Sequence, residues 1–405
     1  MNEREWEVLQ QYDMQVRKIT RFRGAFLCET GREPYLLKEC AVPEERLQWE
    51  AWILERCRNL GGVRTETYVC NREGRLLSRS SDYRYYLLRT WQEGRECSRD
   101  DREDVLLAAG ALAQLHKNFR QMKEELAAWE VIWRQEWEQI RQEEQEAARQ
   151  REEKRREENG IGLRVEEENR TLCTTGEQEP DGSERQDPAE NPANGRDAGR
   201  ETPENIPASS SAKNRTAAEM HRHTREMTRA RNFIRKIRRK SELELVLLSE
   251  FANYLPQAEE ATCGMEALAP AEDGLCHGDY ACHHLFRGND GLFLSDFGRL
   301  HHGVYQEDLY LLLRKTMENS GWDAALAREM LTRYDRIFPL SPELLRYLYP
   351  RFLNPDKFWK QVNFYYNHRK SWMPARNLEK LRAIAAQKEG REAFLHFMEE
   401  NIDRM

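Results

Sequence analysis

The chain has 405 residues, of which 39% are hydrophobic and 33% are charged, and its formal net charge is −7. This length allows two lobes with a sizeable core, and the acidic balance gives no overall attraction to nucleic acid or to an anionic membrane. No apolar run is long enough to cross a bilayer, and the first residues lack the basic and then apolar pattern of a signal peptide. The nine cysteines are odd in number and scattered, which favours reduced thiols and predicts a cytoplasmic protein.

A small lobe is predicted over residues 1–91. Its apolar residues alternate loosely with charged ones and are interrupted by glycines, which is typical of short antiparallel strands. The predicted elements, in order, are a surface helix, three antiparallel strands, a helix with acidic residues in its first turn, and three further strands, over residues 1–13, 14–40, 43–56, 63–70, 75–78 and 84–90.

A mainly helical large lobe is predicted over residues 92–405. Residues 138–214 are predicted to interrupt it, first as a charged helix and then, from residue 159, as a disordered linker rich in Gly, Pro, Ser and acidic residues. A basic run at residues 229–240 could bind nucleic acid, but it has few aromatic residues, so a solvated helix face is favoured and nucleic acid is not an expected partner. After residue 298 the pattern predicts helices to the end.

The most informative stretch is residues 275–286 (LCHGDYACHHLF), followed by residues 291–298 (GLFLSDFG). It predicts a loop carrying Asp279, then two short apolar strands joined by a turn, then a second carboxylate, Asp296. Both carboxylates therefore fall at the same end of a hairpin. This arrangement suits phosphoryl transfer, in which one carboxylate orients an acceptor hydroxyl and the other holds the metal that bridges the nucleotide phosphates.

These residues also carry a family resemblance. The His-Gly-Asp of residues 277–279, with a metal-ligand position five residues later, resembles the catalytic loop of aminoglycoside-phosphotransferase and choline-kinase-like proteins, and residues 308–310 (DLY) fit the same pattern. Further motifs resemble the bacterial spore-coat protein S (CotS-type) branch of that superfamily. They are residues 91–97 (WQEGREC), 349–350 (YP) with 358–359 (FW), and 365–367 (YYN).

The resemblance implies a two-lobed, protein-kinase-like α+β fold, with a small antiparallel β lobe, a mainly helical large lobe and a disordered insertion. It implies ATP and Mg²⁺ as cofactors, with Mn²⁺ as an alternative. In such a fold Asp279 is the catalytic residue, Asp296 ligates the metal, His277 packs under the loop, and Asp308 holds the loop backbone from the next helix.

The small lobe offers candidate nucleotide contacts. Period two places Lys38 on the inner face of its strand, where the resemblance implies contact with the nucleotide phosphates, although the strand pattern alone favours a solvent-exposed lysine. Glu50 lies beside the apolar stripe of the next helix and is the expected partner of Lys38, with Glu45 as a rival. Leu88 and Thr90 belong to the strand that leads to the large lobe, and the backbone of such a connector can bind adenine without particular side chains.

Two positions depart from the family pattern. His284 stands where the family has an Asn whose amide oxygen ligates Mg²⁺, and an imidazole nitrogen suits Zn²⁺ or Mn²⁺ better. We keep His284 as a candidate metal ligand. The turn at residues 23–25 (RGA) lacks the several glycines that normally wrap phosphates. A closed zinc site is disfavoured, because the spacing of the cysteines and histidines matches no four-ligand pattern.

Three function classes therefore stay open, of which nucleic-acid binding through residues 229–240 is the weakest. The leading one is ATP-dependent phosphotransfer to a hydroxyl of a small molecule or cell-envelope component in a sporulation or spore-coat context. Its partners would be a nucleotide, an unidentified hydroxyl acceptor and spore-coat proteins, and its location the cytoplasm with incorporation into the coat. The competing class is a catalytically weak or inactive kinase-like structural protein of the spore coat. The sequence does not identify the acceptor, because acceptor pockets differ while phosphate sites recur.

Overall fold

The structure is a computed structural model that describes residues 3–172, 212–269, 273–289, 291–367 and 374–403. The chain forms two compact units. One comprises Met1–Leu126 and Ser209–Met405, and the other comprises Ala127–Ala208.

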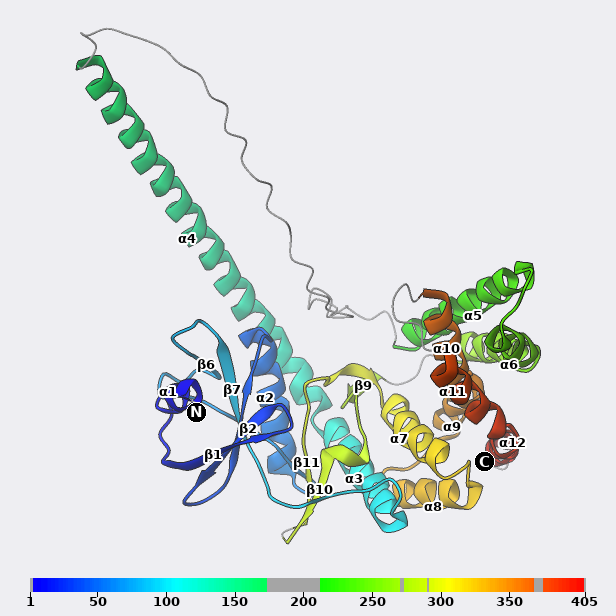
Figure 1. The fold of residues 1–405 in the computed structure, drawn as a ribbon. Helices are drawn as coiled ribbons and strands as arrows, with labels where there is room; N and C mark the ends of the chain where they lie inside the picture. The colour runs from blue at the N-terminus through cyan, green and yellow to red at the C-terminus, as the bar shows by residue number, and fades with distance from the viewer. Residues whose placement is uncertain (1–2, 173–211, 270–272, 290, 368–373, 404–405) are drawn as a thin grey trace. The chain divides into compact units, whose positions relative to one another are not determined.

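The first unit begins with an antiparallel sheet in the strand order β1-β2-β3-β7-β5, with β6 also paired to β7 (Figure 1). Helix α1 (Glu3–Leu9) contributes Val8 and Leu9 to a core cluster with Leu37 and Leu88 of this sheet. The three strands expected between residues 14 and 40 are confirmed. The strands of the sheet are β1 (Val16–Phe22), β2 (Ala25–Thr30), β3 (Tyr35–Glu39), β5 (Tyr68–Val69), β6 (Leu77–Arg79) and β7 (Tyr85–Thr90).

Helix α2 (Glu44–Leu60) follows β3 and runs one turn further than expected. Pro43 precedes it, and Glu44 and Glu45 lie in its first turn, where they complement the helix dipole. Gly61 ends the helix with a φ of 71°, a left-handed conformation that glycine adopts without strain. The helix buries one face and is followed in the chain by the first strand of the second sheet.

The second sheet contains the hairpin that carries the two candidate carboxylates. Its strand order is β4-β11-β10-β8. Strand β10 pairs with β11 from Leu285 opposite Leu294 to Gly288 opposite Gly291, so the predicted hairpin is confirmed. Strand β4 pairs in parallel with β11, so part of the strand expected over residues 63–70 belongs to this sheet and not to the first. The strands are β4 (Arg64–Thr65), β8 (Arg95–Glu96), β10 (Leu285–Gly288) and β11 (Gly291–Leu294).

Two further strands flank the hairpin in sequence. Strand β9 (Asp273–Cys276) pairs with β12 (His301–Val304) in an antiparallel ladder. The prediction that the chain is helical from residue 299 onward is therefore wrong at β12. Gly303 leaves room for this pairing, because a side chain there would meet the sulfur of Cys276 at 2.9 Å.

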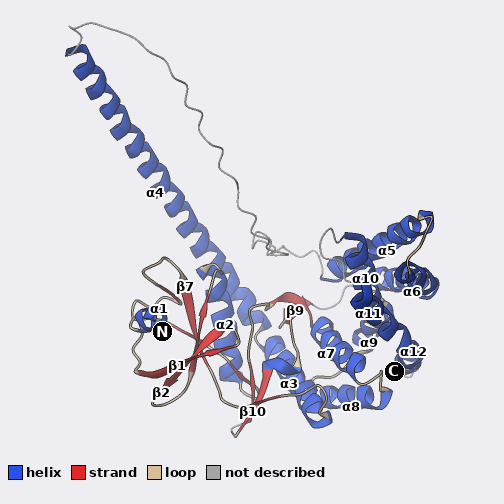
Figure 2. Cartoon of the chain, in the orientation of Figure 1, coloured by secondary structure: helices blue, strands red, loops and turns tan. Residues whose placement is uncertain are grey.

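Helices make up the rest of the first unit (Figure 2). Helices α5, α6, α10 and α11 share an apolar core cluster that includes Ile234, Phe251, Phe358 and Leu381. The helices are α3 (Arg102–Gln121), α5 (Ala212–Lys236), α6 (Glu242–Ala267), α7 (Tyr305–Asn319), α8 (Ala324–Asp335), α9 (Pro342–Leu353), α10 (Asp356–Asn367), α11 (Pro374–Ala386) and α12 (Lys388–Asp403).

Helix α4 (Lys123–Leu172) starts in the first unit and forms the described part of the second. Its Glu and Arg residues are interspersed, a pattern that supports a solvated single helix. The helix covers residues 159–172, which were expected to lack regular structure. Residues 212–214 of the predicted linker belong to α5, and residues 173–211 lie outside the described residues.

The predicted two-lobed α+β, kinase-like fold is confirmed. The lobe boundaries at 1–91 and 92–405 and the insertion limits at 138–214 stay predictions. None of the helices in the described ranges is both long and apolar enough to cross a membrane.

Candidate functional site

A buried carboxylate holds the loop that carries Asp279. Asp308, in the first turn of α7, is fully buried and accepts the backbone N–H groups of His277 at 2.6 Å and Gly278 at 2.9 Å. Burial acts to raise the pKa of Asp308, but the hydrogen bond and charge of His116 and the contacts with the loop bring it below its usual range. The carboxylate is therefore held in its charged form, and the expected role of Asp308 is confirmed.

The loop passes close to the segment that follows β11. Gly278 has a φ of 82°, and a Cβ atom there would lie 2.2 Å from the carbonyl oxygen of Arg299. Only glycine fits this approach. The buried ring of His277 lies below the loop, with its Nε2 3.3 Å from the carbonyl oxygen of Ser295. The expected packing of His277 under the loop is confirmed, and the ring links the two segments that carry the carboxylates.

Asp279 lies at the surface of this loop, with 36% of its side chain exposed. The Nζ of Lys315 lies 3.1 Å from its Oδ1, and the Nε of Arg299 lies 3.9 Å from its Oδ2. Burial acts to raise the pKa of Asp279, but the hydrogen bond and charge of Lys315, followed by Arg299 and His284, lower it overall. Asp279 is therefore ionised near neutral pH and can accept a hydrogen bond through Oδ2.

Asp296 follows β11 in a strained backbone conformation. Its φ is 67°, a left-handed value that costs a residue other than glycine about 1 kcal/mol or more. Its backbone N–H donates to Oε1 of Glu66 at 3.0 Å, and the N–H of Phe297 donates to the same oxygen at 3.2 Å. Glu66 therefore stabilises the turn that aims the Asp296 carboxylate, which remains 44% exposed.

Arg89, on β7, completes this arrangement. Its Nη1 lies 3.1 Å and 3.0 Å from the two carboxylate oxygens of Glu66 and 3.9 Å from Oδ1 of Asp296. The Glu66 side chain is fully buried and the Arg89 side chain is 13% exposed. Burial acts to lower the pKa of Arg89, but Glu66 and Asp296 raise it overall, so the guanidinium stays charged.

Sequence reasoning missed Glu66 and Arg89. Both are charged residues in segments predicted as short strands, where such residues normally face solvent. A signal was present at Arg89, because it follows a run of apolar residues. Such a run is typical of a central strand, and β7 indeed pairs with β3 on one side and β5 on the other. No comparable signal marks Glu66, because the backbone N–H groups that it accepts are about 230 residues away in the chain.

His284 lies between the two candidate carboxylates. Its Nδ1 is 3.7 Å from Oδ2 of Asp296, and its Nε2 is 3.9 Å from Oδ2 of Asp279. Burial, followed by the neighbouring His283, lowers its pKa to about 4, so the ring is neutral at neutral pH. The buried Nε2 has no hydrogen-bond partner among the described residues. The structure thus brings Asp279 and Asp296 together as the hairpin pattern predicted, with His284 between them.

The donor atoms of this site fit a metal that is shared with a nucleotide. Within the described ranges, no group of three or more His, Cys, Asp or Glu side chains could hold a metal ion alone. Asp296 and His284 offer two donors, and Mg²⁺ in phosphate sites commonly takes one or two protein ligands together with phosphate oxygens and water. The imidazole nitrogen adds affinity for Mn²⁺.

The two charged candidates of the small lobe do not meet. The side chain of Lys38 is exposed and makes no hydrogen bond or ion pair with the part of the chain that the structure describes. Glu50 is 2% exposed and accepts hydrogen bonds from Nε of Arg46 at 2.8 Å and the hydroxyl of Tyr68 at 2.7 Å. The expected Lys38–Glu50 pair is therefore not formed, because Arg46, one turn earlier on α2, takes that place. The nucleotide-binding roles of both residues stay predictions.

Leu88 and Thr90 flank Arg89 on β7. Leu88 is fully buried and packs in the core cluster that includes α1. The Oγ1 of Thr90 accepts the backbone N–H of Thr67 at 2.9 Å, and Thr90 borders a groove that Asp279, His284 and Asp296 do not line. The structure does not bring Leu88 and Thr90 to the catalytic loop, and their contact with a nucleotide stays a prediction.

The comparisons with known proteins agree with this geometry. Residues 174–344, which contain Asp279, His284 and Asp296, match the family model described as "Phosphotransferase enzyme family". No curated protein matches the chain. An aminoglycoside phosphotransferase from Alicyclobacillus acidocaldarius subsp. acidocaldarius DSM 446 has a similar structure, with a TM-score of 0.69 and 16% identity, over 99% of this chain and 96% of that chain.

Two further solved structures are more distant. Spectinomycin phosphotransferase APH(9)-Ia has a TM-score of 0.49 and 8% identity, over 95% of this chain and 97% of that chain. The amicoumacin kinase hAmiN has a TM-score of 0.48 and 12% identity, over 96% of this chain and 92% of that chain. The family match and the fold together support a kinase-like phosphotransferase.

Glu66→Gln tests whether Glu66 stabilises the site. We expect the free energy of unfolding to fall by about 2 kcal/mol, because the amide leaves the buried Arg89 without its carboxylate partner and holds the Asp296 backbone less well. Urea unfolding at neutral pH measures the change. Glu55→Gln, at an exposed position of α2, is the matched control and should change stability by less than about 0.5 kcal/mol. An unchanged midpoint for Glu66→Gln would contradict this role.

His284 predicts a pH dependence of stability. Its pKa is about 4 in the folded protein and about 6.5 in an unfolded chain, so below pH 6.5 the unfolded state binds a proton that the folded state refuses. The free energy of unfolding therefore decreases as the pH is lowered through this window. Between about pH 7.5 and pH 5, the metal-free wild type should lose about 2 kcal/mol more than His284→Gln. Parallel curves from urea unfolding in chelator would show that His284 does not titrate in this way.

Proposed function

We propose that the chain is an ATP-dependent phosphotransferase that acts on a hydroxyl of a small molecule or a cell-envelope component. The observation that carries the proposal is the convergence of Asp279 and Asp296 on His284, at 3.9 Å and 3.7 Å from its two ring nitrogens. The family match over residues 174–344 supports phosphoryl transfer as the reaction class. A catalytic loop and a metal-binding position are expected side by side in such a site.

In this proposal Asp279 orients the acceptor hydroxyl. Lys315 holds Oδ1, while Oδ2 lies 3.9 Å from both His284 and Arg299 and is open to a hydroxyl donor. The low pKa of Asp279 makes it a weak base. This is compatible with phosphoryl transfer, because the loose transition state depends more on positioning than on early removal of the proton. The hydroxyl proton would pass to Asp279 as the new phosphorus–oxygen bond forms and the bond between the γ-phosphorus of ATP and its bridging oxygen breaks, releasing ADP.

Asp296 and His284 are the proposed metal ligands, with ATP and Mg²⁺ as cofactors and Mn²⁺ as a substitute. A bound divalent cation would neutralise phosphate charge as the phosphoryl group transfers. A metal on Nδ1 of His284 would leave the proton on Nε2, which points toward Asp279. Lys38, exposed on β3, is the proposed contact to the nucleotide phosphates. Glu50, Leu88 and Thr90 are the other proposed nucleotide-binding residues of the small lobe.

The finer context of the proposal rests on motifs. Residues 91–97, 349–350 with 358–359, and 365–367 resemble the spore-coat protein S branch, which favours a sporulation or spore-coat role. In that setting the protein would act in the cytoplasm and become incorporated into the coat, with other coat proteins as partners. The acceptor would then be a hydroxyl compound of the forming spore or its envelope.

The alternative is a catalytically weak or inactive kinase-like structural protein of the spore coat. Arg89 lies 3.9 Å from Asp296 and competes with a metal for that carboxylate. Trp91 packs between the small sheet and the hairpin, with its ring centroid 4.6 Å from that of Phe286 and 5.6 Å from that of Phe293. An adenine ring that entered this apolar space would have to displace Trp91.

Calorimetric titration of ATP separates the two functions. We expect wild type to bind ATP in the presence of Mg²⁺ or Mn²⁺, and Asp296→Ala to lose the metal-dependent part, because it removes the exposed carboxylate of the site. His284→Asn should shift the preference toward Mg²⁺, since it replaces a nitrogen ligand with an oxygen. Asp13→Asn, at an exposed ion pair with Arg72, is the matched control. Absence of ATP binding with either metal would favour the structural protein.

Asp279→Asn separates binding from chemistry. The amide keeps the shape of the side chain but loses its charge and its pairing with Lys315, so ATP affinity should stay within about twofold while ATP hydrolysis falls by about 10² or more. Steady-state phosphate release, with water as the acceptor, measures the loss. Equal rates for Asp279→Asn and wild type would exclude Asp279 as the catalytic residue.

A further inference from the structure

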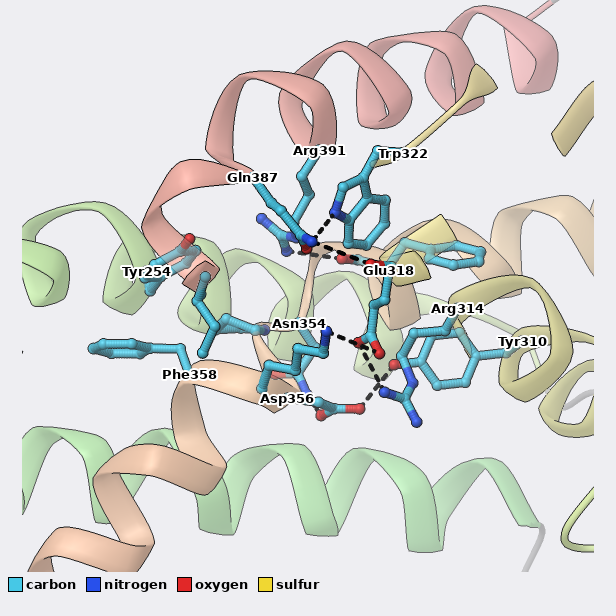
Figure 3. Close-up of a pocket in the computed structure, with 14 residues that line it drawn as sticks. Tyr254, Tyr310, Arg314, Glu318, Trp322, Asn354, Asp356, Phe358, Gln387 and Arg391 are labelled. Carbon is cyan, nitrogen blue, oxygen red and sulfur yellow. Dashed lines mark hydrogen bonds and ion pairs between the residues drawn. The ribbon is translucent and has the colours of Figure 1, made fainter. Parts of the chain in front are cut away.

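Helices of the large lobe enclose a small cavity that the catalytic site does not use (Figure 3). Arg314 of α7 lines it, whereas the next residue, Lys315, contacts Asp279. Consecutive side chains of a helix point about 100° apart, so the cavity and the catalytic loop lie on different faces of α7. Aromatic side chains form much of the wall: Tyr254, Tyr310, Trp322, Phe352 and Phe358.

The two acidic residues of the cavity already have partners. Glu318 lies 2.9 Å from Nη1 of Arg314 and 3.2 Å from Nζ of Lys357. Asp356 accepts hydrogen bonds from the hydroxyl of Tyr310 at 2.8 Å and from Nδ2 of Asn354 at 2.5 Å. These carboxylates therefore have partners of their own, and neither forms an ion pair with Arg391 in the described residues.

Arg391 is the exception. It is 9% exposed, and its guanidinium donates to Oε1 of Gln257 at 2.6 Å and to the carbonyl oxygens of Phe352 and Leu353 at 2.8 Å each. It forms no ion pair with any carboxylate in the described residues. The lining carries three cationic and two anionic side chains, so it has one positive charge in excess.

The surroundings of Arg391 compensate this charge only in part. The rings of Tyr254 and Trp322 lie 5.8 Å and 5.9 Å from its Cζ, near the outer limit of a cation–π contact. Burial lowers the pKa of Arg391 overall, although Tyr254, Tyr310, Asp356 and Glu392 act to raise it. An unpaired buried charge is costly, and an anionic ligand would remove that cost.

Asn354 supplies a second unmet group. It is 4% exposed and lines the cavity from the connection between α9 and α10. Its Nδ2 is used by Asp356, but its buried Oδ1 has no hydrogen-bond partner in the described part of the chain. Buried acceptors normally have a donor, which points to a missing O–H or N–H group.

We propose that this cavity binds a small carboxylate that also carries a hydroxyl or ammonium group. The carboxylate pairs with Arg391, the hydroxyl or ammonium donates to Oδ1 of Asn354, and the aromatic walls cover the carbon atoms. The cavity admits the centres of water-sized molecules over 40 Å³. That is room for about three waters, which corresponds to a compound the size of glycolate or lactate.

Calorimetry with sodium glycolate and sodium lactate tests the proposal on the full chain. We expect saturable binding to wild type, and a matching rise in the thermal unfolding midpoint. Sodium chloride controls for a simple anion, and propane-1,2-diol controls for the hydroxyl group without the charge. Absence of saturable binding to either carboxylate, or an equal response to chloride or the diol, would overturn the proposal.

Three variants locate the site. Arg391→Gln removes the charge but keeps a donor for the backbone carbonyls, and should weaken carboxylate binding by about tenfold or more. Ile384→Phe narrows the cavity and leaves Arg391 in place, so it should abolish carboxylate binding. This variant tests the proposal if Arg391→Gln does not fold. Lys388→Gln, at a half-exposed position of α12 outside the lining, is the matched control and should bind as wild type does. Unchanged binding in Ile384→Phe would overturn the proposal.

Discussion

A buried carboxylate fixes each of the two segments on which the candidate site depends. Asp308 accepts two backbone N–H groups of the loop before Asp279, and Glu66 accepts the N–H groups of Asp296 and Phe297. A carboxylate in the interior is costly unless hydrogen bonds and opposite charge satisfy it. Here the backbone N–H groups of the loops supply part of those hydrogen bonds. A change of conformation in either loop would therefore leave a buried carboxylate without hydrogen-bond partners.

The two carboxylates reach the site from different parts of the fold. Asp308 belongs to α7 of the helical lobe, whereas Glu66 lies between β4 and β5 and is paired with Arg89 of the small sheet. The conformation of Asp296 therefore depends on contact between the small sheet and the hairpin. The neutral ring of His284 then lies between an acidic residue held from the helical lobe and one held from the small lobe.

Local patterns predicted much of the fold. The hairpin of β10 and β11 follows from two apolar strands around a glycine-containing turn, and it places Asp279, His284 and Asp296 at one end. The β9–β12 ladder was missed because each strand has four residues and the pairing joins segments about 25 residues apart. Such short strands are stabilised by tertiary contact more than by propensity.

The charged contacts of the site were harder to predict. The Lys38–Glu50 pair failed because Arg46 is a helical neighbour of Glu50 and reaches it at lower entropic cost than a lysine on another strand. Glu66 and Arg89 were missed because their role depends on contacts made in the folded protein. Glu66 accepts backbone N–H groups, which have no sequence signature, and it pairs with Arg89. Taken alone in the sequence, either residue would be interpreted as a surface charge. Sequence thus locates the acidic residues of the site but not the residues that hold them.

Helix α7 joins the catalytic loop to the cavity around Arg391. Asp308 and Lys315 act on the loop, while Tyr310, Arg314 and Glu318 line the cavity. A ligand in the cavity changes nucleotide binding only if it favours one position of α7 over another. Because Asp308 is bound to the loop by two hydrogen bonds, and Glu318 is already paired with Arg314 and Lys357, neutralising Arg391 requires no movement of α7. The physical consequence of filling the cavity is therefore added stability of the helical lobe, with the geometry around Asp279 left as it is.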